Sequence, residues 1–483
     1  MKYIKKTLKF DWDAGRKVGL LSGSFVEKIR SIFSVPNDTA KFARFRTNSY
    51  VQQRLHAITP TGRFDPCLYY EIRKYINDNN IDVSINKTDS FIKQVYPRYN
   101  TTMKGELSLK LRDYQENIVN NCLSMGRGTV VLATAGGKTL TIASLVSNIH
   151  RITNSLKCLI IVPDLMLVNQ TFSDFKEYRT PFSTSRWTGS HELDLSSHVI
   201  IANAGILQSD KSDTSWTEHV DLLIVDEVHK VRKNNKINKI IKKIKTPHKF
   251  GFTGTMPESL LDQWNITGKI GPIIYEKNSY DLRKEEYISK VVVQVLQLEY
   301  KDKVKKSSTS FNPSINYRKE IDFLVKSEYR NRVITKLCET FDNNALILVD
   351  FIDHGETLYE ILSQSISGKQ IYFIRGDVDL EERDKIKQQM ETDNNIICIA
   401  VSKIFSTGVS IKNLHYITFA GGGKAKIKII QSIGRGLRQH KNKDKVVIFD
   451  IADQLHYGQL HSEKRLQIYN SENIKYKITA LTE

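Results

Sequence analysis

Short apolar runs alternate with longer amphipathic stretches over most of the chain, beginning near residue 107. The first series is TVVLA, CLIIVP, HVIIAN, DLLIVDE and FGFTGT. A second series, NALILVDF, QIYFIRG, NIICIAVS, HYITFAG and KVVIFDIAD, follows residue 340. Continuous β-branched runs of strand length are typical of parallel strands buried on both faces, and the stretches between them have helical periodicity. The pattern therefore predicts two consecutive α/β units of similar size.

Residues 1–100 follow a different pattern, in which strand-like and helix-like segments do not alternate regularly. YIKKTLKFDW predicts a strand, FVEKIRSIFSV a helix, KFARFRTNSYVQQRLHAI one or two strands, and LYYEIRKYINDNN a second helix. Between the two α/β units, EYKDKVKKSSTSFNPSINYRK is polar and contains proline and serine, which is typical of an insertion or a linker. We expect a small α+β domain at 1–100, an α/β domain at 101–290, a linker at 291–330 and a second α/β domain at 331–483.

The formal net charge of +19 changes this picture most. Such an excess indicates a polyanionic partner, because lysine and arginine that bind phosphates release condensed counterions; an ordinary basic surface is the alternative. Residues 1–100 hold 18 Lys and Arg against 9 Asp and Glu, so the excess is strong there. No apolar run is long enough for a membrane span, no secretion signal is visible, and five scattered cysteines form no C-x-x-C pair. We therefore expect a cytoplasmic protein, in the host cytoplasm if it is viral, without a membrane partner.

The segment ATAGGKT, residues 133–139, lies between a predicted strand and an amphipathic helix. This is the context of a phosphate-binding loop, in which Gly136 and Gly137 let backbone N–H groups approach the phosphates. Lys138 would reach the β- and γ-phosphates, and the Thr139 hydroxyl would ligate Mg²⁺. Leu132 replaces the leading glycine of the G-x-x-x-x-G-K-[ST] pattern. Taken alone, the match leaves open a working site, a decayed one and a chance match.

Two further clusters fit nucleotide chemistry. Asp226 and Glu227 directly follow an apolar strand, at the edge where α/β ligands bind. One carboxylate can hold Mg²⁺ while the other deprotonates the attacking water. Arg435 and Arg438, in QSIGRGLRQ, are spaced to share a helical face and to stabilise transition-state charge on phosphate. A solvated acidic turn and a basic surface helix are the respective alternatives.

In this order and spacing, the segments resemble a superfamily 2 helicase of the DExH type over residues 107–465. LRDYQ resembles the Q motif, ATAGGKT motif I, DEVH motif II, FTGT motif III, ALILVDFIDHGETL motif IV, VSKIFSTGVSIKNL motif V and QSIGRGLR motif VI. IIVPDLMLVNQ, RWTGS and VIIANAGILQ resemble the motifs that contact the nucleic-acid backbone. Ala135 stands where many members have glycine, and Ser410 where many have the motif V aspartate, so that acid's role is not carried over.

The resemblance implies a role for each matched residue. Catalysis falls to Lys138, Asp226, Glu227, Gln431, Arg435 and Arg438, and nucleotide binding to Arg112, Gln115, Thr134, Ala135, Gly136, Gly137, Lys138, Thr139 and Gly408. Coupling of hydrolysis to movement falls to His229, Thr253 and Thr255, and nucleic-acid contact to Pro163, Thr188, Asn203 and Thr407. Thr139 and Asp226 would hold the metal.

The chain is most similar to phage recombination helicases of the UvsW type, which also place a small basic domain before the motor. The implied fold class is α/β, with two tandem RecA-like domains preceded by the small α+β domain. The implied cofactors are ATP and Mg²⁺, and the implied partner is DNA, both branched duplex and single strand, in replication, recombination or repair. Arg44, Arg46 and Arg54 of the first domain would contact duplex phosphates, or else lie on a half-buried strand with their side chains in water.

Three other functions remain open. A duplex DNA translocase of the restriction-enzyme type and an RNA helicase share these motifs. A binding module with a degenerate ATP site is opposed by the intact Lys138, Asp226, Glu227, Arg435 and Arg438. We expect a monomer.

Overall fold

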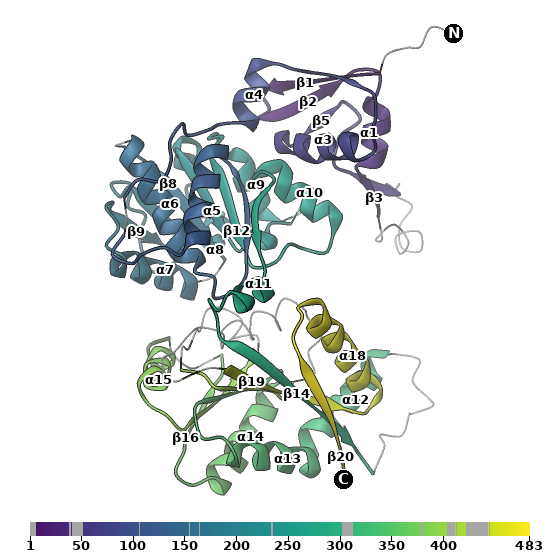
Figure 1. The fold of residues 1–483 in the computed structure, drawn as a ribbon, viewed down its shortest axis with the longest axis vertical. Helices are drawn as coiled ribbons and strands as arrows, with labels where there is room; N and C mark the ends of the chain where they lie inside the picture. The colour runs from purple at the N-terminus through teal and green to yellow at the C-terminus, as the bar shows by residue number, and fades with distance from the viewer. Residues whose placement is uncertain are drawn as a thin grey trace. The chain divides into compact units, whose positions relative to one another are not determined.

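The computed structural model describes residues 6–37, 40, 52–105, 107–153, 155–163, 165–232, 235–301, 313–376, 378, 380–402, 411, 413–421, 443 and 445–483. The chain forms two compact units. The first comprises residues 1–132 and 137–277, and the second comprises residues 133–136 and 278–483. Each unit contains a seven-stranded sheet. Figure 1 shows strands of these sheets as arrows among helices. The predicted fold class, with two tandem RecA-like domains after a small α+β domain, is confirmed.

The sheet of the first lobe has the order β13-β7-β12-β11-β8-β10-β9, and every neighbouring pair is parallel. Its strands are β7 (Gly128–Leu132), β8 (Cys158–Val162), β9 (Thr184–Trp187), β10 (Val199–Asn203), β11 (Leu222–Asp226), β12 (Lys249–Thr253) and β13 (Ile273–Lys277). The chain passes from β7 to β8 in one direction of the sheet and reaches β13 on the other side of β7. This reversal places β7 at a topological switch point, where ligands bind in such sheets.

Helices cover both faces of this sheet, which explains the continuous apolar runs. On one face, Leu159 and Val225 share a core with α9 (Lys236–Lys243) and α10 (Leu260–Lys269). On the other face, α5 (Asp113–Met125), α6 (Lys138–Thr153) and α7 (Leu165–Glu177) cover the alternate residues, such as the fully buried Ile160. Successive strand residues point to opposite faces, so a strand buried on both sides must be apolar throughout.

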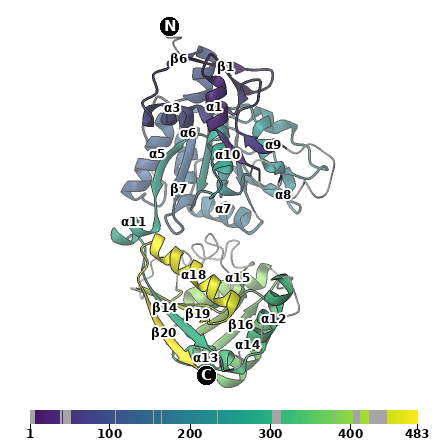
Figure 2. The same cartoon turned by 90° about the vertical axis from the view of Figure 1, so that its right-hand side faces the viewer.

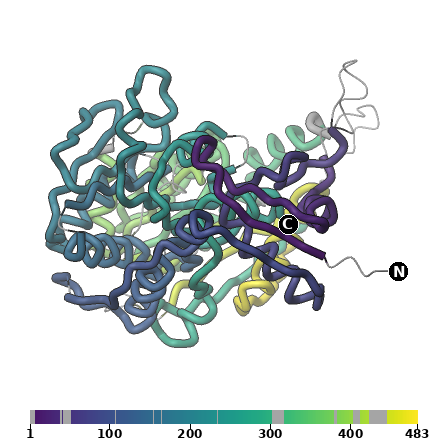
Figure 3. The backbone as a smooth tube through the Cα atoms, turned by 90° about the horizontal axis from the view of Figure 1, so that it is seen from above, coloured from purple at the N-terminus to yellow at the C-terminus, as the bar shows by residue number. Residues whose placement is uncertain are grey.

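The N-terminal domain has its own sheet and its own core. β1 (Thr7–Asp13) pairs antiparallel with β2 (Val18–Ser22) and parallel with β6 (Ser84–Lys87), and β2 pairs with β5 (Arg63–Phe64). In Figure 3 the two strands of the β1–β2 hairpin run side by side as purple tubes. Helices α1 (Val26–Ile32), α3 (Tyr69–Asp78) and α4 (Asp89–Val95) supply the core with this sheet. A short pair, β3 (Ser34–Pro36) and β4 (Arg54–His56), completes the domain.

The N-terminal domain packs directly on the first lobe. Trp264 of α10 enters the N-terminal core, where its ring centroid lies 5.1 Å from that of Phe33. The Lys269 ammonium, on the same helix, forms an ion pair with Asp65. Aromatic burial and a charged contact thus join the domain to α10, which is a helix of the motor.

The sheet of the second lobe has the order β16-β17-β15-β18-β19-β14-β20, again with parallel pairs throughout. Its strands are β14 (Lys290–Glu299), β15 (Ala345–Val349), β16 (Gln370–Ile374), β17 (Ile396–Val401), β18 (Tyr416–Phe419), β19 (Lys445–Asp453) and β20 (Tyr476–Thr482). The described helices are α11 (Ser279–Lys284), α12 (Pro313–Lys326), α13 (Glu328–Glu339), α14 (Ile352–Ser365), α15 (Leu380–Thr392) and α18 (His456–Ser471). α13 and α14 share one core with β15 and β17, and α18 packs against β19 (Figure 2).

The linker expected over residues 291–330 is wrong at both of its ends, since Pro313–Lys326 forms α12 and the first part forms a strand. Lys290–Glu299 forms β14, which lies between β19 and β20 inside the second sheet. Its alternating burial, with Val293, Val295 and Leu298 fully buried, is that of a sheet strand. The main segment of the second unit begins at Asn278, before the expected boundary at 290. The continuous apolar runs of this unit start only after residue 340, so the pattern leaves a strand that precedes the polar segment in the linker.

Within the described residues, no helix combines the length and the apolar character that a bilayer crossing requires.

Candidate nucleotide-binding site

Three neighbouring strands of the first lobe bring the predicted chemistry to one sheet edge. β7 leads into residues 133–137, β11 ends at Asp226, and β12 ends at Thr253. Because β12 lies between β7 and β11 and all three are parallel, their carboxyl ends meet. Lys138 begins α6 directly after the loop. The topology therefore gathers the residues of motifs I, II and III.

The backbone of the motif I loop has two left-handed residues. Gly137 has φ 77° and Ala135 has φ 67°. Glycine adopts this conformation at little cost, whereas alanine is strained by its Cβ. A side chain at position 137 would also collide with the Gln115 amide. The Lys138 ammonium lies 3.4 Å from the Leu132 carbonyl oxygen, which folds this side chain back over the loop.

Gln115 joins the Q motif to this loop. Its Oε1 accepts a hydrogen bond from the Arg112 backbone N–H at 2.9 Å, and its Nε2 donates to the Gly137 carbonyl at 3.2 Å. The Gln115 side chain is buried. Arg112 also donates from its guanidinium to the Tyr114 hydroxyl at 3.0 Å. The sequence placed Arg112 and Gln115 at the nucleotide, but their link to the loop backbone was not predicted.

Asp226 and Glu227 have opposite electrostatic environments. The Asp226 Oδ1 accepts the Glu227 backbone N–H at 2.9 Å. Burial raises the pKa of Asp226, and the adjacent Glu227 charge raises it further. Burial also opposes ionisation of Glu227, but the nearby Lys138 ammonium and the contact with His229 outweigh it, so the pKa of Glu227 lies below its ordinary range. Glu227 is therefore ionised, and a cation beside the half-buried Asp226 would favour the charged form of its carboxylate.

His229 connects Glu227 to the end of β12. Its Nδ1 lies 3.2 Å from Glu227 Oε2 and 2.8 Å from Thr253 Oγ1. Since the Thr253 hydroxyl donates to the Thr255 carbonyl at 2.8 Å, it accepts from the imidazole. Glu227 itself has a left-handed backbone, with φ 50°, a strain that the sequence did not reveal. The three residues predicted to couple hydrolysis to movement thus form one hydrogen-bonded chain that starts beside Glu227.

The other half of the same edge carries the predicted nucleic-acid contacts of this lobe. Pro163 directly follows β8, Thr188 follows β9, and Asn203 ends β10. Pro163 and Asn203 are half-buried, and Asn203 caps α8 (Ala204–Leu207) by accepting the Gly205 N–H at 2.7 Å. Thr188 is buried and its hydroxyl lies 2.9 Å from His191 Nδ1, so this side chain already has an internal partner.

Several predicted site residues lie outside the described residues: Arg44, Arg46, Thr407, Gly408, Gln431, Arg435 and Arg438. Arg54 is described and starts β4. Its guanidinium donates to the Ser34 hydroxyl at 2.8 Å and to the Ser34 carbonyl at 2.9 Å. Arg54 therefore ties β4 to β3 within its own domain.

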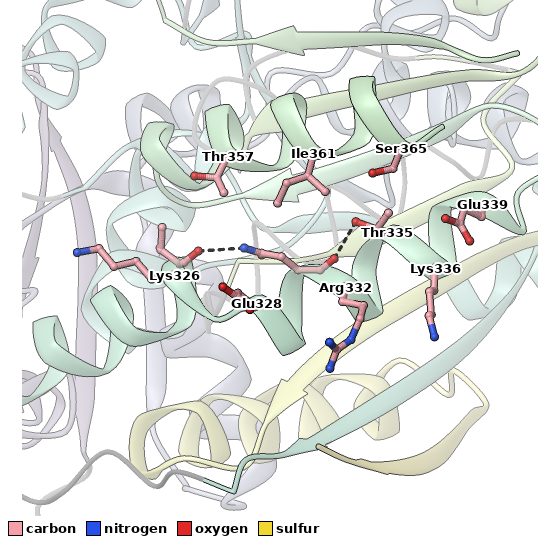
Figure 4. A pocket seen from close by; sticks show the side chains of 11 residues that line it. Lys326, Glu328, Arg332, Thr335, Lys336, Glu339, Thr357, Ile361 and Ser365 are labelled. Atoms are coloured by element: carbon pink, nitrogen blue, oxygen red, sulfur yellow. Dashed lines mark hydrogen bonds between the residues drawn. The ribbon is translucent and has the colours of Figure 1, made fainter. Parts of the chain in front are cut away.

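A cavity of about 500 Å³ lies in the second lobe, along α13 and α14 (Figure 4). Its wall contains the hydrogen bonds from Asn331 Nδ2 to the Val325 carbonyl, at 3.2 Å, and from the Thr335 hydroxyl to the Asn331 carbonyl, at 2.9 Å. None of the predicted site residues lines it. This cavity is therefore lined by residues other than those predicted to bind the nucleotide.

Comparison with known proteins agrees with this geometry. Residues 108–258 match the family described as "Type III restriction enzyme, res subunit", and residues 328–440 match the family described as "Helicase conserved C-terminal domain". The chain is a superfamily 2 helicase. The resemblance drawn from the motifs is thereby confirmed, and the enzyme class is ATP-dependent helicase.

The helicase is similar to proteins from phages and archaea. It is 26% identical to "ATP-dependent DNA helicase uvsW" of Enterobacteria phage T4, over 94% of this chain and 95% of that protein. It is 25% identical to "DNA 3'-5' translocase XPB2" of Sulfurisphaera tokodaii, over 79% of this chain and 88% of that protein. Among solved structures, the "ATP-dependent Type ISP restriction-modification enzyme LlaBIII bound to DNA" has a TM-score of 0.56 at 14% identity, covering 83% of this chain and 33% of that one. At this low sequence identity, the similarity to the restriction-modification enzyme shows a shared fold and nothing about function.

Proposed function

We propose that this helicase uses ATP and Mg²⁺ to move along DNA and to remodel branched substrates such as forks and junctions. The observation that carries the proposal is the extent of the similarity to the T4 phage helicase, which covers 94% of the chain and so includes the N-terminal domain. The basic charge of the N-terminal domain also supports DNA as the partner, because phosphate contacts provide affinity without sequence preference.

Hydrolysis begins with the residues at the edge of the first lobe. Thr134, Ala135, Gly136 and Gly137 present the loop backbone to the phosphates, and Lys138 neutralises their charge. Thr139 and Asp226 would hold Mg²⁺, which would stabilise negative charge on the phosphate oxygens. Glu227, ionised beside Lys138, accepts the proton of the attacking water. Arg112 and Gln115 contact the adenine.

The second lobe completes the reaction and links it to movement. Gly408 contacts the nucleotide, and Gln431, Arg435 and Arg438 act on the phosphates, where arginine stabilises charge in the transition state. Release of the phosphate changes the interaction between Glu227 and His229, and Thr253 passes that change to the end of β12. Pro163, Thr188, Asn203 and Thr407 hold one strand of DNA by its backbone. Arg44, Arg46 and Arg54 of the first domain hold a duplex arm.

The test is ATP hydrolysis by the full chain with matched nucleic acids. A fork, a four-way junction, an unbranched duplex, a single strand and an RNA of equal length are titrated separately at one salt concentration. We expect the fork and the junction to bind most tightly and to stimulate hydrolysis at the lowest concentration. Equal stimulation by RNA supports an RNA helicase instead, and equal stimulation by unbranched duplex supports a translocase of the restriction-enzyme type.

Charge reversal of Arg44 and Arg46 to glutamate tests the N-terminal domain. We expect fork affinity to fall and the salt dependence to become shallower, by about 0.9 log unit of affinity per log unit of salt for each phosphate that the protein no longer neutralises. Hydrolysis stimulated by a single strand should be unchanged, because the residues that hold the strand belong to the motor. An unchanged ratio of fork to single-strand affinity would assign this domain a purely structural role.

A further inference from the structure

A second cavity lies where the N-terminal domain meets the first lobe. Its volume is about 220 Å³. It is lined by Trp12, Ala14, Lys17, Asp65, Pro66 and Gln94 of the N-terminal domain, and by Arg127, Ile241, Lys242, Ile244, Lys245, Thr246, Lys249 and Lys269 of the lobe. Arg127 directly precedes β7, and Lys249 is the first residue of β12. The cavity is therefore at the amino ends of the strands, on the edge opposite the nucleotide site.

The lining is strongly basic. Six of its side chains are cationic, and Asp65 is its one carboxylate. Asp65 is paired with Lys269, and Glu218, outside the lining, lies 3.4 Å from Lys17 and 2.9 Å from Lys245. Two carboxylates thus face six cations. The lining of this small cavity therefore carries an excess of positive charge.

Two of these cations are buried in the wall without a carboxylate partner within the described chain. Arg127 is 2% exposed and donates to the carbonyls of Ile270, Gln94 and Lys269. Carbonyl oxygens satisfy its N–H groups, but they do not neutralise its charge. Burying a charge in this way is costly unless an ion of opposite sign compensates it.

Lys249 is the second buried cation, at 8% exposure. Its ammonium donates to the carbonyls of Ile241 at 3.1 Å and Ile244 at 2.8 Å, at the end of α9. An ammonium has three N–H donors, and within the described residues the third has no hydrogen-bond partner. Capping of α9 accounts for the first two hydrogen bonds, but it explains neither the third donor nor the other cations that surround the space.

We propose that this cavity is an anion site that binds one phosphate group, held between the N-terminal domain and the first lobe. Lys249 and Arg127 form its floor, and the exposed Lys242 and Lys245 lie at its mouth. The volume is below the range of about 300–1,000 Å³ typical of pockets that enclose a whole organic ligand, so a single tetrahedral anion fits better than a nucleotide. The phosphate belongs either to a nucleic-acid backbone or to the free ion.

Binding at this site has a proton signature. Burial and the nearby Arg127 lower the pKa of Lys249 to about 7. The other titratable groups around it are Lys269, which lowers the pKa further, and Cys67 and Asp65, which raise it. An anion beside this ammonium favours its charged form, so phosphate binding should take up a proton above pH 7. The P-loop offers no buried lysine of this kind, so proton uptake distinguishes the two anion sites.

The experiment is calorimetric titration of the full chain with inorganic phosphate at constant ionic strength, repeated in two buffers of different ionisation enthalpy. All variants carry Lys138→Ala, which removes the phosphate grip of the nucleotide site. We expect Lys249→Met to abolish proton uptake. We expect the double variant Lys242→Gln with Lys245→Gln to weaken phosphate binding at least about tenfold, since each of its two substitutions removes a charge-assisted contact. Lys239→Gln, an exposed lysine of α9 outside the lining, is the matched control and should bind normally.

Two outcomes would contradict the proposed anion site. One is equal phosphate affinity in the parent chain, the mouth double variant and the Lys239→Gln control. The other is proton uptake that persists in Lys249→Met. Because the mouth residues are exposed, the double variant should fold, and circular dichroism checks this.

Competition with a short unbranched duplex separates the two sources of phosphate. If the duplex loses affinity in the mouth double variant and phosphate competes with it, the ligand is the nucleic-acid backbone. If duplex affinity is unchanged while phosphate binding is abolished, the ligand is the free ion. Neither result depends on the preference for branched DNA proposed above, because the duplex used has no branch.

Discussion

The imidazole Nδ1 of His229 lies 2.8 Å from the hydroxyl oxygen of Thr253, so a residue that follows β11 is bonded to the last residue of β12. The same nitrogen lies 3.2 Å from Glu227. Glu227, the proposed general base, is therefore linked to the end of β12 through the His229 imidazole. The proposed coupling role of His229 therefore predicts that the position of Thr253 depends on the state of Glu227.

Thr253→Val should uncouple hydrolysis from DNA movement. The substitution keeps the shape of this fully buried side chain and removes the acceptor of the His229 hydrogen bond. We expect DNA unwinding per ATP hydrolysed to fall about tenfold, the equivalent of one hydrogen bond of about 1.4 kcal/mol. Unwinding and phosphate release are measured together on one fork. Parallel losses of both rates would show that Thr253 serves hydrolysis itself.

Lys138→Ala and Glu227→Gln should separate nucleotide binding from chemistry. Lys138→Ala removes a charge-assisted contact of about 1.5–3 kcal/mol and should weaken ATP binding. Glu227→Gln removes the proposed base and should leave ATP affinity nearly unchanged while hydrolysis stops. Fluorescent nucleotide binding and steady-state phosphate release measure the two effects. Turnover close to that of the natural sequence in either variant would contradict the assignment of the site.

The left-handed residues of the motif I loop predict opposite effects of two small changes. Ala135→Gly relieves a backbone strain of about 1–2 kcal/mol and should preserve or raise ATP affinity. Gly137→Ala creates such a strain and a collision with Gln115, and should lower ATP affinity at least tenfold, an effect of about 1.4 kcal/mol. Gly189→Ala, where a Cβ meets open space, is the control. Normal ATP affinity in Gly137→Ala would show that the loop rearranges freely.

Arg330→Met should strongly destabilise the second lobe. Arg330 is 2% exposed, and its Nε donates to Asp453 at 2.9 Å while Nη2 donates to the Ala420 carbonyl at 2.6 Å. Removing it leaves a buried carboxylate uncompensated, at a cost of about 3–5 kcal/mol, which lowers the thermal midpoint by roughly 10 °C. Arg375→Gln, whose pair with Glu356 is 41% and 44% exposed, should cost less than about 1 kcal/mol. Differential scanning fluorimetry measures the thermal midpoints of both variants. Similar decreases in the two midpoints would contradict the predicted difference between the buried and the exposed ion pair.

Lys249 should make stability depend on pH in the alkaline range. Its pKa in the folded chain is about 7, below the value of about 10.4 in the unfolded chain, so the unfolded state binds more protons between these values. Stability therefore rises with pH across this window, by up to about 1.4 kcal/mol per pH unit from this group. Urea unfolding at pH 7 and pH 9, without phosphate, should show this rise in the natural sequence and in Lys239→Gln. A rise of the same size in Lys249→Met would assign it to other groups.

The sequence was sufficient for the sheets and for the identity of the motifs because both depend on local patterns. Apolar runs predicted most of the strands, and Lys138, Asp226 and Glu227 stand at the ends of such runs or directly after them. Backbone strain at Glu227 and the hydrogen bond from Gln115 to Gly137 were not predictable, since both arise from contacts between segments distant in sequence. Lys249 was unremarkable in a lysine-rich segment, and only its burial distinguishes it from its neighbours.

The β14 strand was missed for a related reason. Its pattern is local and clear, but its partners are β19 and β20, which follow far along the chain. A polar segment and most of the second lobe, from α12 to β18, come between them. Sheet order is a tertiary property, and the position of these residues directly before a polar segment favours a linker instead.

The position of β14 between β19 and β20 has a consequence for how the protein is made. During synthesis β14 leaves the ribosome well before either strand that pairs with it, so both of its hydrogen-bonding edges stay open while the rest of the second lobe is being translated. A nascent chain arrested before Tyr476–Thr482 exposes one of these edges permanently. Ribosome stalling in the last stretch of the message should therefore produce a chain that aggregates through β14, and a disaggregating chaperone should act at that stage rather than on the finished enzyme.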